Sequence, residues 1–542
     1  MTGPRTEADT IGDLLLRAAE RAPAAAAVVF PKQRATYAEL VQGSMRMARG
    51  LHAVGVRPGE HVGILMPNCL AMVEALFGVA LLGAVSCPIN ARYRSAELRH
   101  VIEDADLAVL LTSDTVEEHV DYVPLLYEAL AGLADCDPEH VRVEAAPKLR
   151  TVVVFGRRRA TGMMGQERFG AHADSVPDSV VESSSTSVRG RDPAVVLYTS
   201  GTTANPRGCV ITHEAIVRGS RATGLREQIG SGDVVWDPLP LFHTSGLQPL
   251  LYTLDAGARF LCMTHFEPGA AIAQIRANGV TLLKSTFPPV TMALVNHADF
   301  PALDVSRIRV VQIVAPPDTL RLVQAAFPNA AIQGAYGLCE AGGYVAVNEP
   351  EETLESRLRT VGRPFPGIEI RAVDEDGGDA APGEPGELLV RGYTVFEGYY
   401  RDSAQTAKAL DHDGWLHTGD RGTVDAAGRV TFLGRIKEMI RVGGENVAPA
   451  EIEGFLSTHP AVHLVQAVGI PDERLDEVPA VFVELKPGAA VTGQELIDHC
   501  RGKIASFKVP RYVSFVEEWP MSATKIQRFR LRDQLLAELG LG

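Results

Sequence analysis

The sequence predicts an α/β protein. We expect a large N-terminal domain of mixed, largely parallel βαβ sheets and a smaller C-terminal α+β domain joined to it by a hinge. Helical and strand patterns alternate through the first 150 residues, and regular patterning resumes at residue 194 and continues to about residue 434. Short apolar strands that alternate with helices are typical of parallel sheets covered on both faces. At roughly 100–200 residues per domain, 542 residues suffice for about three units, or for one large domain with a smaller satellite.

The N-terminal elements follow from the spacing of apolar residues. Periodicity predicts helices over 36–54, 69–82 and 95–105, and buried strands over 61–66, 85–89, 107–111 and 194–198. Residues 157–191 interrupt the pattern with three arginines, a glycine and a serine-rich stretch at 182–187. Composition of this kind is typical of loops, so we expect a mobile surface loop there.

The C-terminal elements have a different order. We expect a helix over 451–457, strands over 462–468 and 479–485, and helices over 492–501 and 528–539. The change of character places the domain boundary near residue 435. We therefore predict an N-terminal domain of residues 1–434, a hinge of residues 435–437 and a C-terminal domain of residues 438–542.

Composition excludes several classes of protein. The chain has 67 acidic and 52 basic residues, and a formal charge of −15 argues against broad nucleic-acid binding. Its seven cysteines are scattered without a CxxC pair, which fits neither a zinc site nor a disulfide framework and indicates a reducing compartment. The first ten residues lack the apolar core of a secretory signal, and the longest uncharged apolar run, 75–89, is too short to span a bilayer. We expect a cytoplasmic protein with no membrane span.

A glycine- and hydroxyl-rich segment follows the strand at 194–197. Residues 198–208 are Tyr-Thr-Ser-Gly-Thr-Thr-Ala-Asn-Pro-Arg-Gly. Backbone N–H groups and hydroxyls in such a turn can surround an anion, and the arginine adds a fixed positive charge. The spacing is not that of a Walker A motif, and a turn of this composition alone is most often a solvated surface loop.

Five further motifs follow in order. They are Leu-Pro-Leu-Phe-His-Thr-Ser-Gly at 239–246, Ala-Tyr-Gly-Leu-Cys-Glu at 335–340, Gly-Trp-Leu-His-Thr-Gly-Asp at 414–420, Gly-Arg-Ile-Lys-Glu-Met-Ile-Arg-Val-Gly-Gly-Glu-Asn-Val at 434–447, and Lys-Ile-Gln-Arg at 525–528. Taken singly, each is open to a plain structural interpretation, such as a buried histidine or a surface lysine. All six together resemble the motifs of the adenylate-forming superfamily, and the closest likeness is to acyl- and aryl-CoA synthetases, which are AMP-forming acid–CoA ligases. The resemblance spans nearly the whole chain.

The resemblance implies a reaction in two steps. A carboxylate attacks the α-phosphorus of ATP and gives acyl-AMP and pyrophosphate, and the thiol of CoA then displaces AMP. ATP and CoA would be co-substrates, Mg²⁺ the metal, and a small carboxylic acid the remaining partner.

The resemblance also implies a role for each motif residue. The β- and γ-phosphates would be held by Thr199, Ser200, Gly201, Thr202, Thr203 and Arg207. Tyr336 would stack on adenine, Asp420 and Arg435 would bind the ribose, and Glu340 would hold Mg²⁺. His243 would gate an acyl pocket lined by Thr244, Ser245, Gly246, Val314, Gly334 and Ala335.

The remaining roles belong to the C-terminal domain. Lys525 would be the catalytic lysine that bridges the acyl carboxylate and the α-phosphate. Lys437 would be the hinge about which this domain rotates between the two steps. After rotation, Gly443 and Gly444 would line the passage for the pantetheine arm of CoA, and Arg441 would swing toward the same site.

Three departures from the family pattern fall on the ATP half of the chemistry. Ala204 and Arg207 replace a glycine and a lysine, Cys339 stands where the family has threonine, and the glycine before Lys525 is missing. One residue fewer shifts the lysine by up to about 3.5 Å. An enzyme with weakened adenylation that thioesterifies a preformed acyl-adenylate is therefore an alternative.

Other readings stay open at this point. An adenylation enzyme that loads a carrier protein, a luciferase-like oxidative enzyme and a non-catalytic binding protein share many of these residues. The sequence identifies neither the acid nor the oligomeric state, a homodimer included.

Overall fold

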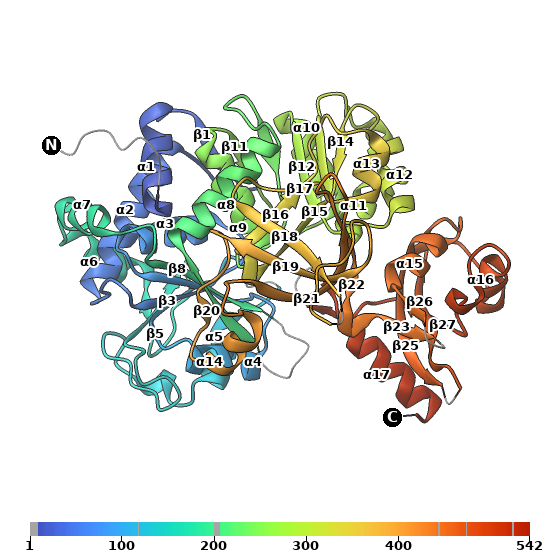
Figure 1. The fold of residues 1–542 in the computed structure, drawn as a ribbon. Coiled ribbons are helices and arrows are strands. Elements are labelled where there is room, and N and C mark those ends of the chain that lie inside the picture. Colours follow the sequence, from blue (N-terminus) through green and yellow to red (C-terminus); the bar gives the residue numbers. More distant parts are fainter. Residues whose placement is uncertain are drawn as a thin grey trace.

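The computed structural model describes residues 9–116, 119–199, 206–374, 376–442, 445–472, 474–522 and 525–541, without the side chains at 445, 446, 522 and 525. Its architecture is α/β, as the sequence predicts, with two large, mostly parallel sheets in the N-terminal part (Figure 1). In Figure 1 the C-terminal elements, coloured orange to red, form a smaller lobe beside this larger part.

The first large sheet carries the phosphate-loop segment. Its strand order is β20-β9-β8-β4-β3-β5-β6-β7. The pairs from β8 to β7 are parallel, whereas β9 pairs antiparallel with both β8 and β20. The strands are β3 (His61–Leu65), β4 (Val85–Pro88), β5 (Leu107–Ser113), β6 (Thr151–Phe155), β7 (Met164–Gly165), β8 (Pro193–Thr199), β9 (Arg207–Thr212) and β20 (Gly398–Tyr399).

Helices cover this sheet where the apolar periodicity predicts them. Thr36 and Glu39 form a capping box that fixes the start of α2, and α3 is apolar on nearly all sides because it lies in the core. The helices of this region are α2 (Tyr37–Ala53), α3 (Leu70–Leu81), α4 (Ser95–Asp104), α5 (Tyr122–Ala129), α6 (Gln166–Asp174), α7 (Asp178–Ser187) and α14 (Ser403–Ala409), with the short turn η1 (Leu133–Asp135).

The expectation of a mobile loop over 157–191 is wrong. The segment forms β7, α6 and α7, and Phe169 and Val181 point into the core with 3% and 0% exposure. The hydroxyls of Ser184 and Ser187 donate to carbonyls one turn back, which lets a serine-rich stretch stay helical. The few large apolar residues of these short helices, Phe169 in α6 and Val180 and Val181 in α7, were too weak a signal against that composition.

The second large sheet has the order β14-β13-β12-β10-β11-β1-β2 and is parallel except for the edge pair β1–β2. Its strands are β1 (Ala26–Val29), β2 (Arg34–Thr36), β10 (Val234–Trp236), β11 (Arg259–Leu261), β12 (Leu282–Thr286), β13 (Val310–Ile313) and β14 (Ala331–Gln333). The helices and turns of this region are α1 (Ile11–Arg21), α8 (His213–Arg226), α9 (Thr244–Asp255), α10 (Pro268–Asn278), α11 (Pro288–Val295), η2 (Phe300–Ala302), α12 (Pro317–Ala326) and α13 (Leu354–Arg359).

Two small antiparallel sheets carry the middle motifs. One has the order β15-β16-β17 and the other β18-β19-β21-β22. Their members are β15 (Ala335–Leu338), η3 (Cys339–Ala341), β16 (Gly343–Val347), β17 (Arg363–Pro364), β18 (Ile368–Val373), β19 (Gly386–Gly392), β21 (Leu416–Val424) and β22 (Val430–Arg435).

The C-terminal lobe is the predicted α+β unit. Its sheet runs β24-β23-β26-β25, with β27 paired to β26. The elements are η4 (Ile436–Glu438), β23 (Ile440–Val442), β24 (Glu445–Val447), α15 (Pro449–Ser457), β25 (Val462–Asp472), β26 (Asp476–Leu485), α16 (Gly493–Cys500), η5 (Ser506–Lys508), β27 (Tyr512–Phe515), β28 (Met521–Ser522), β29 (Lys525–Ile526) and α17 (Arg528–Leu539).

The lobe docks on the N-terminal part through α15. This helix packs on α12 and β22, and Asn296 Nδ2 lies 3.3 Å from His463 Nδ1 across the junction. Gly454 of α15 makes the contact close, because a Cβ at this position would lie only 2.8 Å from Cβ of Pro316.

Candidate active site

Three motif residues from two sheets meet in one arrangement. The hydroxyl of Tyr336, on β15, donates to Oδ2 of Asp420, on β21, at 2.8 Å. Arg435 is the cross-strand partner of Asp420 in β22, and its Nε lies 2.9 Å from Oδ1 of that carboxylate. The sequence motifs predicted these three residues, and the structure brings them together from positions up to 99 residues apart in the chain.

Burial and charge set the protonation of this group. Tyr336 is 5% exposed and Asp420 2% exposed. Burial, with the Asp420 carboxylate beside it, raises the pKa of Tyr336 far above its usual value. Burial alone would lower the pKa of Arg435, but the carboxylates of Asp420 and Glu340 outweigh it and raise that pKa. Tyr336 therefore stays a phenol and Arg435 a guanidinium at neutral pH.

Phe432 extends the aromatic surface, and the sequence analysis missed it. Its ring stacks on that of Tyr336, with centroids 5.8 Å apart and planes at 28°, and it is 38% exposed. Phe432 lies on β22 three residues before Arg435, outside the pattern that drew attention to the motif. β22 and β15 belong to different sheets, so the packing of these two sheets brings the ring to Tyr336.

Gly334 shapes the turn that leads into β15. Its N–H donates to Oδ1 of Asn348 at 2.9 Å, and a Cβ at this position would meet that same oxygen at 3.2 Å. The next residue, Ala335, is 4% exposed. A side chain at 334 would push Asn348 away, so the small residue keeps this turn tight.

A second group surrounds Glu340. The hydroxyl of Tyr399 donates to Oε1 of Glu340 at 2.9 Å, and the guanidinium carbon of Arg207 lies 5.6 Å from the centre of the Tyr399 ring. Burial and the charge of Glu340 raise the pKa of Tyr399, so this phenol remains a donor. Tyr399 is another residue that the motifs did not predict, although it lies in the aromatic pair that follows Gly398.

The phosphate-loop residues are described only at the two ends. Thr199 ends β8 and Arg207 begins β9, and the two are cross-strand partners. Ser200, Gly201, Thr202 and Thr203 lie outside the described residues, as does Ala204. The β8–β9 pairing thus holds the two described ends of this motif side by side.

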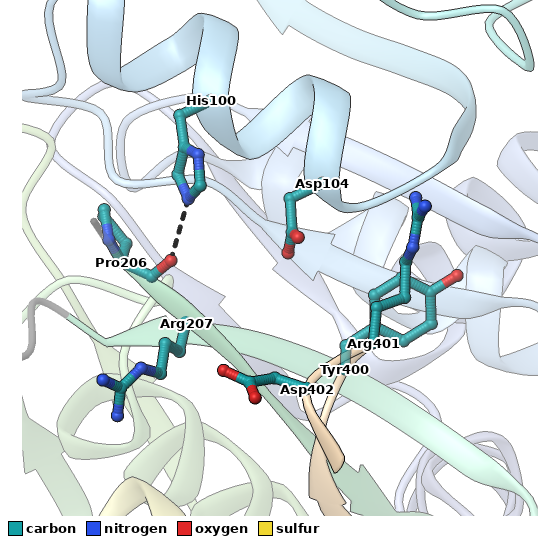
Figure 2. Close-up of a pocket in the computed structure, with 7 residues that line it drawn as sticks. All are labelled: His100, Asp104, Pro206, Arg207, Tyr400, Arg401 and Asp402. Atoms are coloured by element: carbon teal, nitrogen blue, oxygen red, sulfur yellow. Dashed lines mark hydrogen bonds between the residues drawn. The ribbon is translucent and has the colours of Figure 1, made fainter. Parts of the chain in front are cut away.

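A cavity of about 350 Å³ adjoins the end of this loop (Figure 2). Figure 2 shows His100 from α4 facing the carbonyl of Pro206, with Nε2 and the oxygen 3.0 Å apart. The lining is of mixed charge and comprises His100, Asp104, Pro206, Arg207, Tyr400, Arg401 and Asp402. Its described lining includes neither Tyr336 nor Asp420, and it shares Arg207 with the group around Glu340.

The second motif starts α9 and reaches Cys339. His243 is the N-cap of this helix and is half-buried, with its ring 4.9 Å from that of Phe242. Oγ1 of Thr244 lies 3.9 Å from Sγ of Cys339, which joins two motifs far apart in the chain. Of the other expected acyl-pocket residues, Ser245 and Val314 are half-buried and Gly246 is buried.

The hinge and lysine motifs lie in the C-terminal lobe. Lys437 is exposed in η4, and Arg441 is exposed on β23, where its backbone N–H donates to Glu477 at 3.0 Å. Both line a separate cavity of about 310 Å³. Gly443 and Gly444 lie outside the described residues, and for Lys525 the structure describes the backbone, which pairs with Ser522 in the β28–β29 hairpin.

Glu340 fits a magnesium nucleotide better than a protein-enclosed metal. Among the described residues, no three His, Cys, Asp or Glu side chains group to hold a metal ion. Mg²⁺ commonly takes one or two carboxylates and completes its shell with nucleotide phosphates and waters. Glu340 has one oxygen bonded to Tyr399, and its second oxygen could serve as such a ligand.

Comparison with known proteins decides the family. Residues 15–400 match the model of the AMP-binding enzyme family, and residues 451–525 match that of the AMP-binding enzyme C-terminal domain. The chain belongs to this family. It is thus a member of the adenylate-forming superfamily, and its two family regions are those of an AMP-forming ligase.

Similar curated proteins carry acyl-CoA synthetase names. The putative acyl-CoA synthetase YngI of Bacillus subtilis (strain 168) is 33% identical over 540 residues, which is 98% of either chain. The mitochondrial medium-chain acyl-CoA ligase ACSF2 of Rattus norvegicus is 31% identical over 98% of this chain and 88% of its own. These relatives share the full length of the present chain.

A solved structure shows the same fold. The anthranilate CoA ligase AuaEII in complex with anthranoyl-AMP superposes with a TM-score of 0.87 at 26% identity, over 98% of each chain.

In the part of this chain that the structure describes, we find no helix with both the length and the hydropathy to cross a membrane.

Proposed function

We propose that this enzyme activates a small carboxylic acid with ATP and transfers the acyl group to CoA, giving acyl-CoA, AMP and pyrophosphate. The observation that carries the proposal is the meeting of Tyr336, Asp420 and Arg435, close enough to Glu340 for its charge to act on Arg435. An aromatic face, an ionised carboxylate and a guanidinium form the set that binds a nucleoside through its base and its two ribose hydroxyls. Membership of the AMP-binding family supports the same ligand.

In the first step the site must gather positive charge and oriented donors around anions. The β- and γ-phosphates would be held by Thr199, Ser200, Gly201, Thr202, Thr203 and Arg207. When bound at Glu340, Mg²⁺ would neutralise charge on the phosphate oxygens. Lys525 would place its ammonium between the acyl carboxylate and the α-phosphate, and His243 would gate the acyl pocket.

In the second step CoA needs access to the acyl-AMP. We propose domains of residues 1–434 and 438–542 that rotate about a hinge at 435–437, with Lys437 absorbing the change in backbone angles. Exposure of Lys437 in a short turn between β22 and β23 supports this placement. Rotation would replace Lys525 by Gly443 and Gly444 at the shared pocket, with Arg441 beside them.

The acid belongs to a class that relatives suggest. A medium-chain acyl-CoA ligase is a full-length relative, and an anthranilate CoA ligase shares the fold. We propose a medium-chain or a small aromatic acid.

The reducing environment indicated by seven scattered cysteines supports a cytoplasmic location, which fractionation of the native host would test.

The experiment is an acid panel with matched acceptors. The enzyme is incubated with ATP, Mg²⁺ and one acid from a straight-chain series or an aromatic series, with CoA or a phosphopantetheinylated carrier protein. AMP release and thioester mass are both measured. We expect both products with CoA and at least one acid. AMP release with thioester on the carrier protein and none on CoA would identify the carrier-loading alternative. Oxygen uptake during the reaction would identify the oxidative alternative.

A second arm tests the weakened-adenylation alternative. Thioester formation from synthetic acyl-AMP is compared with ATP–pyrophosphate exchange, because Cys339 and the shortened lysine motif bear only on the latter. Similar rates in the two assays would exclude the alternative.

A further inference from the structure

Arg528 joins three elements of the C-terminal lobe. It is the first residue of α17, three residues after Lys525. Its Nη1 donates to Oε2 of Glu438 at 2.8 Å, and its Nη2 donates to both carboxylate oxygens of Glu453 at 2.8 and 3.0 Å. The guanidinium thus spans a carboxylate beside the hinge and another on α15.

The two carboxylates differ in their other contacts and in their exposure. Glu453 is 7% exposed, and its Oε1 also accepts the backbone N–H of Ala467 on β25 at 2.9 Å. Glu438 follows Lys437 directly in η4, and its side chain is 35% exposed. The Glu453 arm therefore belongs to the packing of the lobe, whereas the Glu438 arm links α17 to the hinge turn.

The geometry of the link is restrictive. A planar guanidinium presents its donors in a fixed fork, so pairing with two carboxylates fixes distance and orientation together. Burial would lower the pKa of Arg528, but Glu453 and Glu438 outweigh it and raise that pKa. The guanidinium therefore keeps its charge.

The backbone of Lys525 is tied to the same point. Ser522 and Lys525 are cross-strand partners in the β28–β29 hairpin, and the N–H of Gln527 donates to the carbonyl of Pro520 at 2.7 Å, which closes the hairpin. Ile526 packs on the cluster of Leu531 and Leu535 beneath it. Movement of Arg528 would therefore move the lysine backbone.

We propose that Arg528 is a positioning residue that holds Lys525 at a fixed place relative to the hinge. The proposal rests on the proposed function. Glu438 and Arg528 both lie beyond the hinge residue, so they move together when the lobe rotates. Rotation at 437 then brings the lysine to one position over the nucleotide. With the Glu438 link lost, the hairpin and α17 can shift against the hinge turn while the lobe stays folded.

The test separates positioning from stability through the two half-reactions. Lys525 serves acyl-AMP formation and not thioester transfer. Since a misplacement of about 1 Å can cost about 100-fold in rate, we expect Glu438→Gln to slow ATP–pyrophosphate exchange by about 10- to 100-fold. Thioester formation from synthetic acyl-AMP should change less than about 3-fold, and the melting temperature should stay close to that of the parent.

Three further variants sharpen the result. Arg528→Lys keeps a charge that can serve one carboxylate but not both, so its exchange rate should lie between those of the parent and Arg528→Met. Arg530→Gln is the matched control, because Arg530 is exposed on the same helix and its guanidinium lies over Phe529, 5.9 Å from the ring centre. It should leave both half-reactions unchanged.

The decisive measurement is a double-mutant cycle. If Arg528 acts through the lysine, Glu438→Gln has no further effect on exchange in a Lys525→Ala background. Additive losses, or equal losses in both half-reactions with a lower melting temperature, would overturn the inference and leave Arg528 a structural residue. Unchanged exchange in Lys525→Ala alone would instead overturn the proposed function.

Discussion

At the scale of single residues, the chemistry of the site depends on one buried carboxylate. Asp420 accepts the Tyr336 hydroxyl and pairs with Arg435, and it is 2% exposed. A carboxylate can accept hydrogen bonds from both hydroxyls of a ribose. The neighbours of Asp420 therefore fix the direction in which it presents its oxygens.

We predict that Asp420→Asn weakens ATP and AMP binding by at least about 10-fold. The change removes the ion pair with Arg435, whose side chain is 46% exposed, and an acceptor for the ribose hydroxyls. A hydrogen bond to a charged group contributes about 1.5–3 kcal/mol, and about 1.4 kcal/mol corresponds to 10-fold in affinity. Calorimetric titration with AMP checks the prediction. Asp413→Asn, at an exposed position in the preceding turn, is the control and should bind normally. Equal affinity in both variants would contradict the assignment of Asp420.

We expect a smaller effect from the substitution Phe432→Ala in the same assay. Aromatic pairs contribute about 0.5–1.5 kcal/mol, so Phe432→Ala should weaken nucleotide binding by roughly 2- to 10-fold through the orientation of Tyr336. Phe515→Ala removes a similarly exposed phenylalanine from β27 and should have no effect. Unaltered AMP affinity in Phe432→Ala would show that the stack only covers apolar surface.

The sequence predicted the residues that lie inside motifs and missed those that reach the site from beside them. Tyr336, Glu340, Asp420 and Arg435 were found because they lie in motifs that resemble those of the adenylate-forming superfamily. Phe432 and Tyr399 were missed because their contacts depend on how separate sheets pack together, which no local sequence pattern encodes.

At the scale of elements, α3 shows what burial does to a lone acid. The helix is apolar on nearly all sides, and Glu74 is its acidic residue. Burial raises the pKa of Glu74 from 4.5 to about 7, although the charge of Arg46 acts in the opposite direction. Between these two pH values the folded protein therefore keeps a proton on Glu74 that the unfolded chain releases.

This shift predicts a pH-dependent stability. Below about pH 4.5 the carboxyl is protonated in both states and has no effect. Between pH 4.5 and about 7 the unfolded chain ionises this group more readily than the folded protein does. The free energy of unfolding therefore falls over this range and levels off above it. Glu74→Gln should raise the melting temperature at pH 8, by the equivalent of up to about 3 kcal/mol, and change it little at pH 4.5.

The control for this measurement is Glu128→Gln, on the exposed side of α5. It should show the pH dependence of the parent. A Glu74→Gln curve parallel to the parent between pH 4.5 and pH 8 would refute the assignment of a buried, proton-binding carboxyl.

Element prediction succeeded where periodicity was strong. The helices over 37–53 and 70–81 and the strands around 61–65 and 107–113 lie where the apolar pattern puts them. The helices α6 and α7 were missed because each buries so few apolar residues that serine and arginine dominate the local composition.

At the scale of the whole molecule, the account requires the small lobe to leave its present contact with α12. Gly454 tests this requirement, since a Cβ there would lie 2.8 Å from the rigid ring of Pro316. Gly454→Ala should disfavour the docked orientation without weakening the lobe, because alanine raises helix propensity by about 1 kcal/mol.

The expected result is unequal rates in the two half-reactions. If each step uses a different orientation, Gly454→Ala should change the exchange rate and the thioester-forming rate by factors that differ about 5-fold or more, which corresponds to about 1 kcal/mol. Identical factors would argue that one orientation serves both steps.

The two-lobe mechanism is tested most directly by Lys525→Ala in both half-reactions. The account predicts a loss of at least about 100-fold in ATP–pyrophosphate exchange, because the ammonium bridges the reacting anions. It predicts a change of less than about 3-fold in thioester formation from synthetic acyl-AMP and CoA, because by then the lysine has rotated away. Equal losses in the two assays, or no loss in exchange, would contradict it.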